Sequence, residues 1–129
     1  MGLSLSTIHQ IAVHASNLDR SIAFYRDQLG ARFIAKFDPP GLAFFRFGDT
    51  RLLLERAAPR ATIYFRVHDI AESFELLRAR GVPFDAEPRV VHRDDEGLFG
   101  PVGADEWMAF FHDPDGNVLA IVAQSMPKS

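Results

Sequence analysis

Five side chains capable of binding or proton-transfer chemistry sit at alternating positions of short apolar segments: Gln10, His14, Glu55, Tyr64 and Arg66. Alternating strand positions point to one face, so these groups are expected to share the open face of a sheet. His14 or Glu55 could act as a general base. Arg66 could hold an anionic group, because a guanidinium offers several N–H donors in a fixed arrangement. The set predicts a site for a small, anionic organic molecule.

Each of these residues also has an ordinary structural explanation. Arg66 and Glu55 could simply pair with each other, since structural ion pairs are common. His14 could be a half-buried histidine without a role, and Gln10 could satisfy its amide from backbone groups alone. Only their convergence on one face favours the binding interpretation, and no residue is assigned a catalytic role.

An internal repeat defines the elements that position these residues. Residues 10–26 align with residues 62–78 at a constant offset, and both copies have the order strand, polar cap and amphipathic helix. Each predicted helix carries an apolar stripe at helical spacing: Leu18, Ile22, Tyr25 and Leu29 in the first, and Ile70, Phe74 and Leu77 in the second. Asn17 and Asp69 are the expected N-caps, and Gly30 and Gly81 the expected stops. Both helices should cover one face of a sheet.

Three strand-like segments follow each helix. They span residues 31–37, 42–47 and 51–55 in the first half, and 82–91, 106–112 and 117–123 in the second. The fold class is therefore predicted to be α+β, with two βαβββ modules at about 7–57 and about 61–124 within a single domain of residues 1–129.

A polar, glycine-containing loop is predicted at residues 93–105. A loop of this length in a compact domain is either functional or a simple insertion. His92 at its start and Trp107 just after it are added to the candidate ligand-binding residues, because an indole can stack on a flat ligand. Alternatively, Trp107 only packs in the core.

The composition narrows the class of protein. The chain has 129 residues, a formal net charge of -3 and no cysteine. Interspersed charges without a basic stripe argue against nucleic-acid binding, and the lack of cysteine excludes disulfides and thiolate metal sites. No apolar run approaches the roughly 20 residues of a membrane span. We expect a cytoplasmic protein whose partner is a small molecule.

Three segments carry recognisable motifs: QIAVHASNLDRSIAFYRDQLG, YFRVHDIAESFELLRARGVPF and FFHDPDGNVLAIVAQ with its DPDGN turn. They resemble the vicinal-oxygen-chelate superfamily of glyoxalases, bleomycin resistance proteins and extradiol dioxygenases. Together with the repeat they cover nearly the whole chain. The resemblance implies that the modules form an incomplete curved barrel around a cleft, commonly within a homodimer, and that four side chains bind a divalent metal.

The four metal-ligand positions of the family fall on Gln10, Leu53, Thr62 and Ala120. Gln10 is an acceptable ligand, whereas leucine and alanine have no donor atoms and threonine is a poor neutral ligand. Glu55 lies two residues beyond Leu53 on the same face and could substitute for it. No metal cofactor is therefore predicted. The alternative is Fe, Ni, Mn or Zn in a non-standard site.

The leading hypothesis is a superfamily protein that binds a small, anionic organic molecule in its concave cleft without the family metal. Bleomycin itself is basic and does not match a cleft that contains Arg66. The alternative is a metal-dependent glyoxalase-type lyase or isomerase, or a dioxygenase. A third hypothesis is a structural or interaction module without a ligand.

Overall fold

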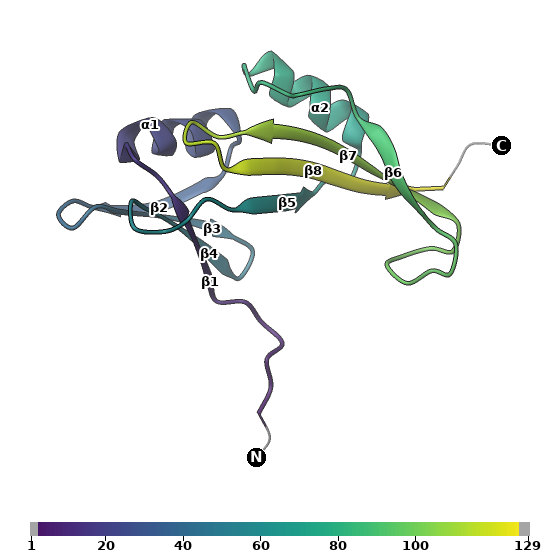
Figure 1. The fold of residues 1–129 in the computed structure, drawn as a ribbon, viewed down its shortest axis with the longest axis horizontal. Helices are drawn as coiled ribbons and strands as arrows, with labels where there is room; N and C mark the ends of the chain where they lie inside the picture. The colour runs from purple at the N-terminus through teal and green to yellow at the C-terminus, as the bar shows by residue number, and fades with distance from the viewer. Residues whose placement is uncertain (1–2, 127–129) are drawn as a thin grey trace. The chain divides into compact units, whose positions relative to one another are not determined.

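The computed structural model describes residues 3–126. Its first half contains β1 (Gln10–His14), α1 (Leu18–Ala23), the π-helical turn η1 (Phe24–Gln28), β2 (Arg32–Phe37), β3 (Leu42–Phe47) and β4 (Thr50–Glu55). The strands form one open sheet in the order β1-β4-β3-β2 (Figure 1). β1 runs parallel to β4, and the other neighbours are antiparallel.

The second half repeats this arrangement. It contains β5 (Thr62–Arg66), α2 (Ile70–Ala79), β6 (Arg89–Asp94), β7 (Ala104–His112) and β8 (Val118–Ser125). These strands form a second open sheet in the order β5-β8-β7-β6, in which β5 is parallel to β8. The α+β class and the repeated βαβββ order are confirmed. Within residues 3–126, no helix is long and apolar enough to cross a membrane.

The contacts divide the chain into two compact units. The first extends to Ala61 and also includes Asp113–Asn117; the second contains Thr62–His112 and the chain from Val118 onward. The DPDGN turn, which lies in the second module by sequence, is thus part of the first unit. The single domain at residues 1–129 stays a prediction.

Buried polar bonds hold this turn against α1. The Asp115 carboxylate accepts hydrogen bonds from the backbone N–H of Ser16 at 3.0 Å, the hydroxyl of Ser21 at 3.0 Å and the guanidinium of Arg20 at 3.2 Å. Burial acts to raise the pKa of Asp115, but the hydrogen bonds from Ser16 and Ser21 and the charge of Arg20 more than offset it, so the pKa lies below its usual value. The carboxylate is therefore held in its charged form by its partners.

Asp113 and Asn117 close the same network. One Asp113 oxygen accepts the Tyr25 hydroxyl at 2.6 Å and the Asn117 side-chain amide at 2.7 Å. That amide also donates to the carbonyl of His14 at 2.8 Å, while its oxygen accepts the N–H of Ala61 at 2.9 Å. The turn thereby satisfies buried donors and acceptors on β1 and on the chain that leads into β5.

The two helix starts agree with the sequence. Asn17 accepts the N–H of Arg20 at 3.1 Å, and Asp69 accepts the N–H of Glu72 at 3.0 Å. The first helix differs after Ala23, where it widens into η1. This turn places Phe24 as well as Tyr25 in the core, because a π-helical turn adds a residue to the helical repeat.

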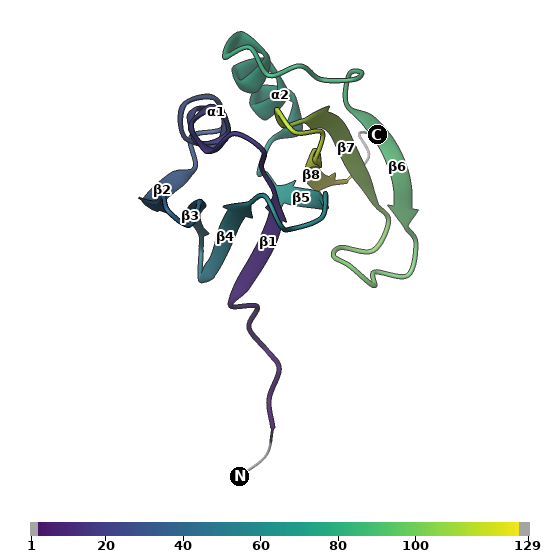
Figure 2. The same ribbon diagram turned by 60° about the vertical axis from the view of Figure 1, so that its left-hand side comes forward.

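The helix-facing sides of the sheets were predicted well. Val13 and Leu54 are fully buried in the first unit, as is Leu119 in the second, and Ile121 is 2% exposed. Ile11 departs from this pattern, since 38% of it remains exposed near the start of β1. Figure 2 shows α1 and α2 each lying against the sheet of its own unit.

One predicted strand was wrong over much of its length. Residues 82–91 were expected to be extended, but β6 begins only at Arg89. Pro83 and Pro88 interrupt the segment, and proline cannot donate to a strand ladder. Only Phe84 keeps a bridge, to Phe111. The loop that follows β6 is also shorter than predicted, at residues 95–103.

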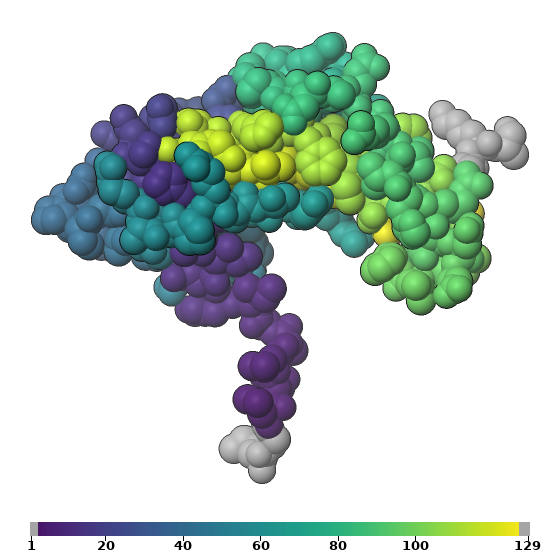
Figure 3. Space-filling model, viewed as in Figure 1, coloured from purple at the N-terminus to yellow at the C-terminus, as the bar shows by residue number. Residues whose placement is uncertain are grey.

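The segment before β1 is anchored only at its end. The carbonyl of His9 accepts the N–H of Arg51 at 2.9 Å, and the carbonyl of Ile8 accepts the Thr50 hydroxyl at 2.8 Å. Leu3 and Leu5 are each 89% exposed, and the space-filling view shows this segment projecting from the first unit (Figure 3).

Candidate functional site

The helix-free face of the second sheet contains a hollow beside Arg66. β5 pairs with β8 so that Tyr64 lies opposite Ala120 and Arg66 opposite Val122. The hollow has a volume of about 300 Å³ and is lined by Tyr64, Arg66, Glu106, Met108 and Val122. The Tyr64 ring stands edge-on to Phe110 with 6.0 Å between the ring centroids. This hollow therefore combines one cation, Arg66, and one carboxylate, Glu106, with aromatic and apolar walls.

A second hollow shares Arg66. It has a volume of about 470 Å³ and is lined by Arg66, Val67, His68, Pro101 and Gln124. The Gln124 side-chain amide lies so close to Gly100 that it leaves no room for a Cβ at that position. The loop after β6 therefore approaches the sheet closely here, and its Pro101 forms part of the wall.

The Arg66 guanidinium is available to a ligand. Within residues 3–126 it forms no hydrogen bond and no ion pair, and the residue is exposed. Glu106, on the wall of the same hollow, also has no bonded partner in that part of the chain. Arg66 belongs to the second unit and Glu55 to the first, so the alternative of an ion pair between them stays a prediction.

Asp94 shapes the loop that supplies Pro101. One carboxylate oxygen accepts the N–H of Leu98 at 2.8 Å; the other accepts those of Phe99 at 2.8 Å and Gly100 at 3.1 Å. The Phe99 bond is the main reason why the pKa of Asp94 lies below its usual value, against an opposing effect of burial. A charged Asp94 is what organises residues 98–100.

His92 lies on the same face as Arg66. It sits opposite Glu106, which in turn sits opposite Gln124, so the three form one row across β6, β7 and β8. The His92 ring is edge-on to Phe99 with 6.3 Å between the centroids. The structure therefore places three of the predicted candidates on one face of the second sheet: Tyr64 and Arg66 on β5, and His92 on β6 at its opposite edge.

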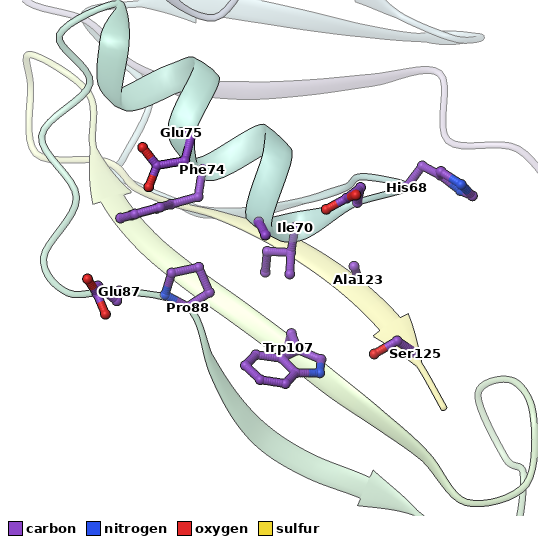
Figure 4. A pocket seen from close by; sticks show the side chains of 11 residues that line it. His68, Ile70, Phe74, Glu75, Glu87, Pro88, Trp107, Ala123 and Ser125 are labelled. Atoms are coloured by element: carbon purple, nitrogen blue, oxygen red, sulfur yellow. The ribbon is translucent and has the colours of Figure 1, made fainter. Parts of the chain in front are cut away.

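Trp107 points to the other face of this sheet. It lines a cavity of about 700 Å³ beside α2, together with Ile70 and Phe74 (Figure 4). Trp107 therefore does not share the Arg66 face, and its role as a ligand-binding residue stays a prediction. Glu106 and Met108, its neighbours in β7, occupy the Arg66 face instead, because side chains alternate along a strand.

The other three candidates lie on the first sheet. Gln10 sits opposite Arg51, and His14 opposite Glu55. The Nδ1 atom of His14 is 3.0 Å from the carbonyl oxygen of Arg56, so one nitrogen of this ring already has a backbone partner. The side chains of Gln10 and Glu55 have no hydrogen-bond partner among residues 3–126.

The residues at the family's metal-ligand positions do not fit a metal. Leu53 is 8% exposed and Ala120 is fully buried, so both serve the apolar core and neither has a donor atom. Thr62 offers only a hydroxyl, which leaves Gln10 as the one ordinary ligand. Across the described chain, no group of three or more His, Asp or Glu side chains is arranged to hold a metal ion.

Glu106 and Gln124 were missed at the sequence level. The apolar run around them in β7 and β8 hides the alternation that assigns residues to faces. Because β5 pairs with β8, Arg66 lies opposite Val122, and Gln124 is two residues further along the same strand. Strand alternation would therefore have placed Gln124 on the Arg66 face, had this pairing been known.

Comparisons with known proteins agree with this architecture. No curated protein sequence matches the chain. Among solved structures, lactoylglutathione lyase from Agrobacterium tumefaciens is similar at 26% identity and a TM-score of 0.69, covering 93% of this chain and 95% of the lyase. TnmS3, an antibiotic binding protein from a Streptomyces species, is similar at 21% identity and a TM-score of 0.75, covering 96% of this chain and 100% of TnmS3.

A family description fits most of the sequence as well. A superfamily member from Sphaerobacter thermophilus is similar in structure at 23% identity and a TM-score of 0.71, covering 94% of this chain and 99% of its own. The sequence model of the Glyoxalase/Bleomycin resistance protein/Dioxygenase superfamily matches residues 7–121. The chain therefore belongs to the glyoxalase/bleomycin resistance protein/dioxygenase superfamily.

Proposed function

We propose that this protein binds a small aromatic or apolar carboxylate on the helix-free face of the second sheet, without the family metal. The observation that carries the proposal is the exposed Arg66 guanidinium, which has no partner within residues 3–126 and lines two adjoining hollows. A carboxylate would pair with both arms of this fork. The Tyr64 ring and Met108 would contact the apolar part of the ligand.

Two further observations support a binding role. The loop at residues 95–103 is held in shape by Asp94 and places Pro101 against the Arg66 hollow, so part of the wall is preorganised. TnmS3, which shares the fold, is named as an antibiotic binding protein. This likeness supports the binding of an organic ligand by this architecture, but it does not identify the ligand.

Titration with benzoate tests the proposal, with benzyl alcohol as its uncharged counterpart. We expect benzoate to bind, benzyl alcohol to bind more weakly, and Arg66→Ala to weaken benzoate at least about tenfold, since a charge-assisted hydrogen bond contributes roughly 1.5–3 kcal/mol. Arg26→Ala is the matched control, because Arg26 is an exposed arginine of the first unit that pairs with its neighbour Asp27. Equal benzoate affinity in the Arg66→Ala variant and the parent, measured by calorimetry, would contradict the proposal.

The second candidate function is a glyoxalase-type lyase or isomerase, or a dioxygenase, with a non-standard metal site. The 26% identity to lactoylglutathione lyase is the observation in its favour. Metal analysis of protein purified without chelators decides between the two proposals. Stoichiometric iron, nickel, manganese or zinc would favour the enzyme.

We further propose that the protein is a cytoplasmic homodimer, as is common in this superfamily. Sedimentation velocity of the purified chain measures its assembly state directly, and a single species at the monomer mass would exclude the dimer. Cell fractionation would test its location.

A further inference from the structure

Three arginines lie side by side across the first sheet. β3 pairs with β2 so that Arg46 is opposite Arg32, and with β4 so that Arg46 is also opposite Arg51. Strands β2, β3 and β4 are neighbours in Figure 2. Directly opposed residues have Cβ atoms about 4.5–5.5 Å apart, so the three side chains form a continuous arginine row.

The arginine row occupies the helix-free face of this sheet. Its neighbours along the strands, Phe45 and Leu52, are buried on the side that α1 covers. Since successive side chains alternate, Arg46 and Arg51 point away from the helix. Gln10 lies opposite Arg51 and extends the row by one uncharged amide.

No acidic group of the described chain neutralises this row. None of the three guanidinium groups forms a hydrogen bond or an ion pair within residues 3–126. Arg51 lies over the Phe44 ring at 5.6 Å from its centroid, and the Nε atom of Arg51 is buried without a hydrogen-bond partner. A buried donor without a partner costs free energy unless something outside the described chain binds it.

The electrostatics of the row favour a bound polyanion. Like charges directly opposite one another destabilise a sheet, and a cation held between two others gains most from a ligand with several negative charges. Two adjacent guanidinium groups can bind two linked anionic groups, because each guanidinium donates a pair of N–H bonds to the oxygens of one group. The chain as a whole has a formal net charge of -3, so it does not attract anions without such a local site.

We propose that the arginine row of Arg32, Arg46 and Arg51 is a binding site for a small ligand with two linked anionic groups, of the diphosphate type. Arg46 is the central anchor because it adjoins both other arginines. The amide of Gln10 supplies a further donor at one end. The carboxylate site proposed around Arg66 is made of other residues, on the other sheet.

Calorimetric titration with pyrophosphate tests the site. We expect pyrophosphate to bind the parent protein more tightly than orthophosphate does, and the affinity to fall as salt increases. Arg46→Gln should weaken pyrophosphate binding at least about tenfold. Arg66→Ala and the surface control Arg26→Gln should leave the affinity for pyrophosphate unchanged. The arginine row and the carboxylate site can therefore fail or succeed separately.

A second measurement compares melting temperatures without and with pyrophosphate. Because Arg46 faces two like charges, Arg46→Gln should raise or preserve the melting temperature of the ligand-free protein, and pyrophosphate should raise that of the parent alone. Equal pyrophosphate affinity in parent and Arg46→Gln overturns the proposal. The proposal is also overturned if Arg46→Gln changes the sedimentation coefficient of the protein but not its affinity for pyrophosphate. That result would make the row a contact between copies of the chain.

Discussion

The charged residues of this protein differ in whether they have partners. Asp113 and Asp115 are buried in the first unit, where hydrogen bonds engage both carboxylates and an ion pair engages that of Asp115. Arg46 and Arg66 are exposed and have no partner within residues 3–126. The acidic turn therefore stabilises the fold, whereas the free arginines are available for binding.

Tyr25→Phe should destabilise the protein by about 1–2 kcal/mol, because it removes the donor of a buried hydrogen bond to a charged acceptor. The 2.6 Å bond to Asp113 is lost, and the Asn117 amide remains as a donor to the same oxygen. Chemical denaturation of both proteins measures the difference. A free energy of unfolding equal to that of the parent would show that the Tyr25 hydroxyl contributes nothing.

The same hydroxyl predicts a response to alkali. Burial raises the pKa of Tyr25 above its ordinary value, and the charge of Asp113 adds to the effect. The folded state therefore holds this proton more tightly than the unfolded chain, so the contribution is complete below about pH 10 and is lost as pH rises further. Melting temperatures between pH 8 and pH 11 should fall less steeply in Tyr25→Phe than in the parent.

At the scale of elements, the loop between β6 and β7 is organised by one side chain. Asp94 ends β6, and its carboxylate accepts three successive backbone N–H groups at residues 98–100. Leu98 and Phe99 nevertheless remain 71% and 64% exposed. The loop is thus fixed through its backbone, while its apolar side chains are free to contact a ligand or another protein.

Acid should weaken the bonds by which Asp94 holds this loop. The pKa of Asp94 is lowered by its bonds to Phe99, Leu98 and Gly100. Its contribution is therefore present above the ordinary aspartate pKa of about 3.9 and is lost as pH falls through the lower folded value. Hydrogen exchange should show protection of the amides at residues 98–100 at neutral pH.

Asp94→Ala is the variant for this test, and it should abolish that protection at every pH while the amides of β7 stay protected. Asp95→Ala is the matched control, because the side chain of Asp95 makes no hydrogen bond within residues 3–126. Equal exchange at residues 98–100 in parent and Asp94→Ala would show that other contacts hold the loop.

At the scale of the whole molecule, the two halves of the sequence are not two independent halves of the structure. The first unit is completed by Asp113–Asn117, which arrives only after most of the second unit. Asn117 bonds to the carbonyl of His14 and to the N–H of Ala61, so the first unit relies on the distant turn for buried partners.

A chain that ends at residue 61 should therefore fail to form a stable first unit. It retains every strand of the first sheet but leaves the Tyr25 and Ser21 hydroxyls without their acceptors. Circular dichroism and amide dispersion in NMR spectra would detect this loss, with the full chain as reference. A cooperative unfolding transition in the fragment would show that the turn is dispensable.

Much of the fold could be predicted because it follows from local patterns. The N-caps Asn17 and Asp69, the order of the elements and the buried faces of the strands all depend on residues close together in sequence. The segment at residues 82–88 could not be placed, because its apolar residues suit a strand while its two prolines prevent regular pairing. Of the residues that line the two hollows beside Arg66, the sequence had singled out Tyr64 and Arg66.

The sequence by itself determined the family, the two βαβββ modules and the loss of donor atoms at Leu53 and Ala120, since these depend on residue type and order alone. The tertiary structure decided which residues share a face and a row. It set Trp107 on the side of α2, joined Glu106 to His92, and aligned the arginine row. The physical reason is that strand register is set by pairing between distant segments, and moving it by one residue reverses the face of every side chain.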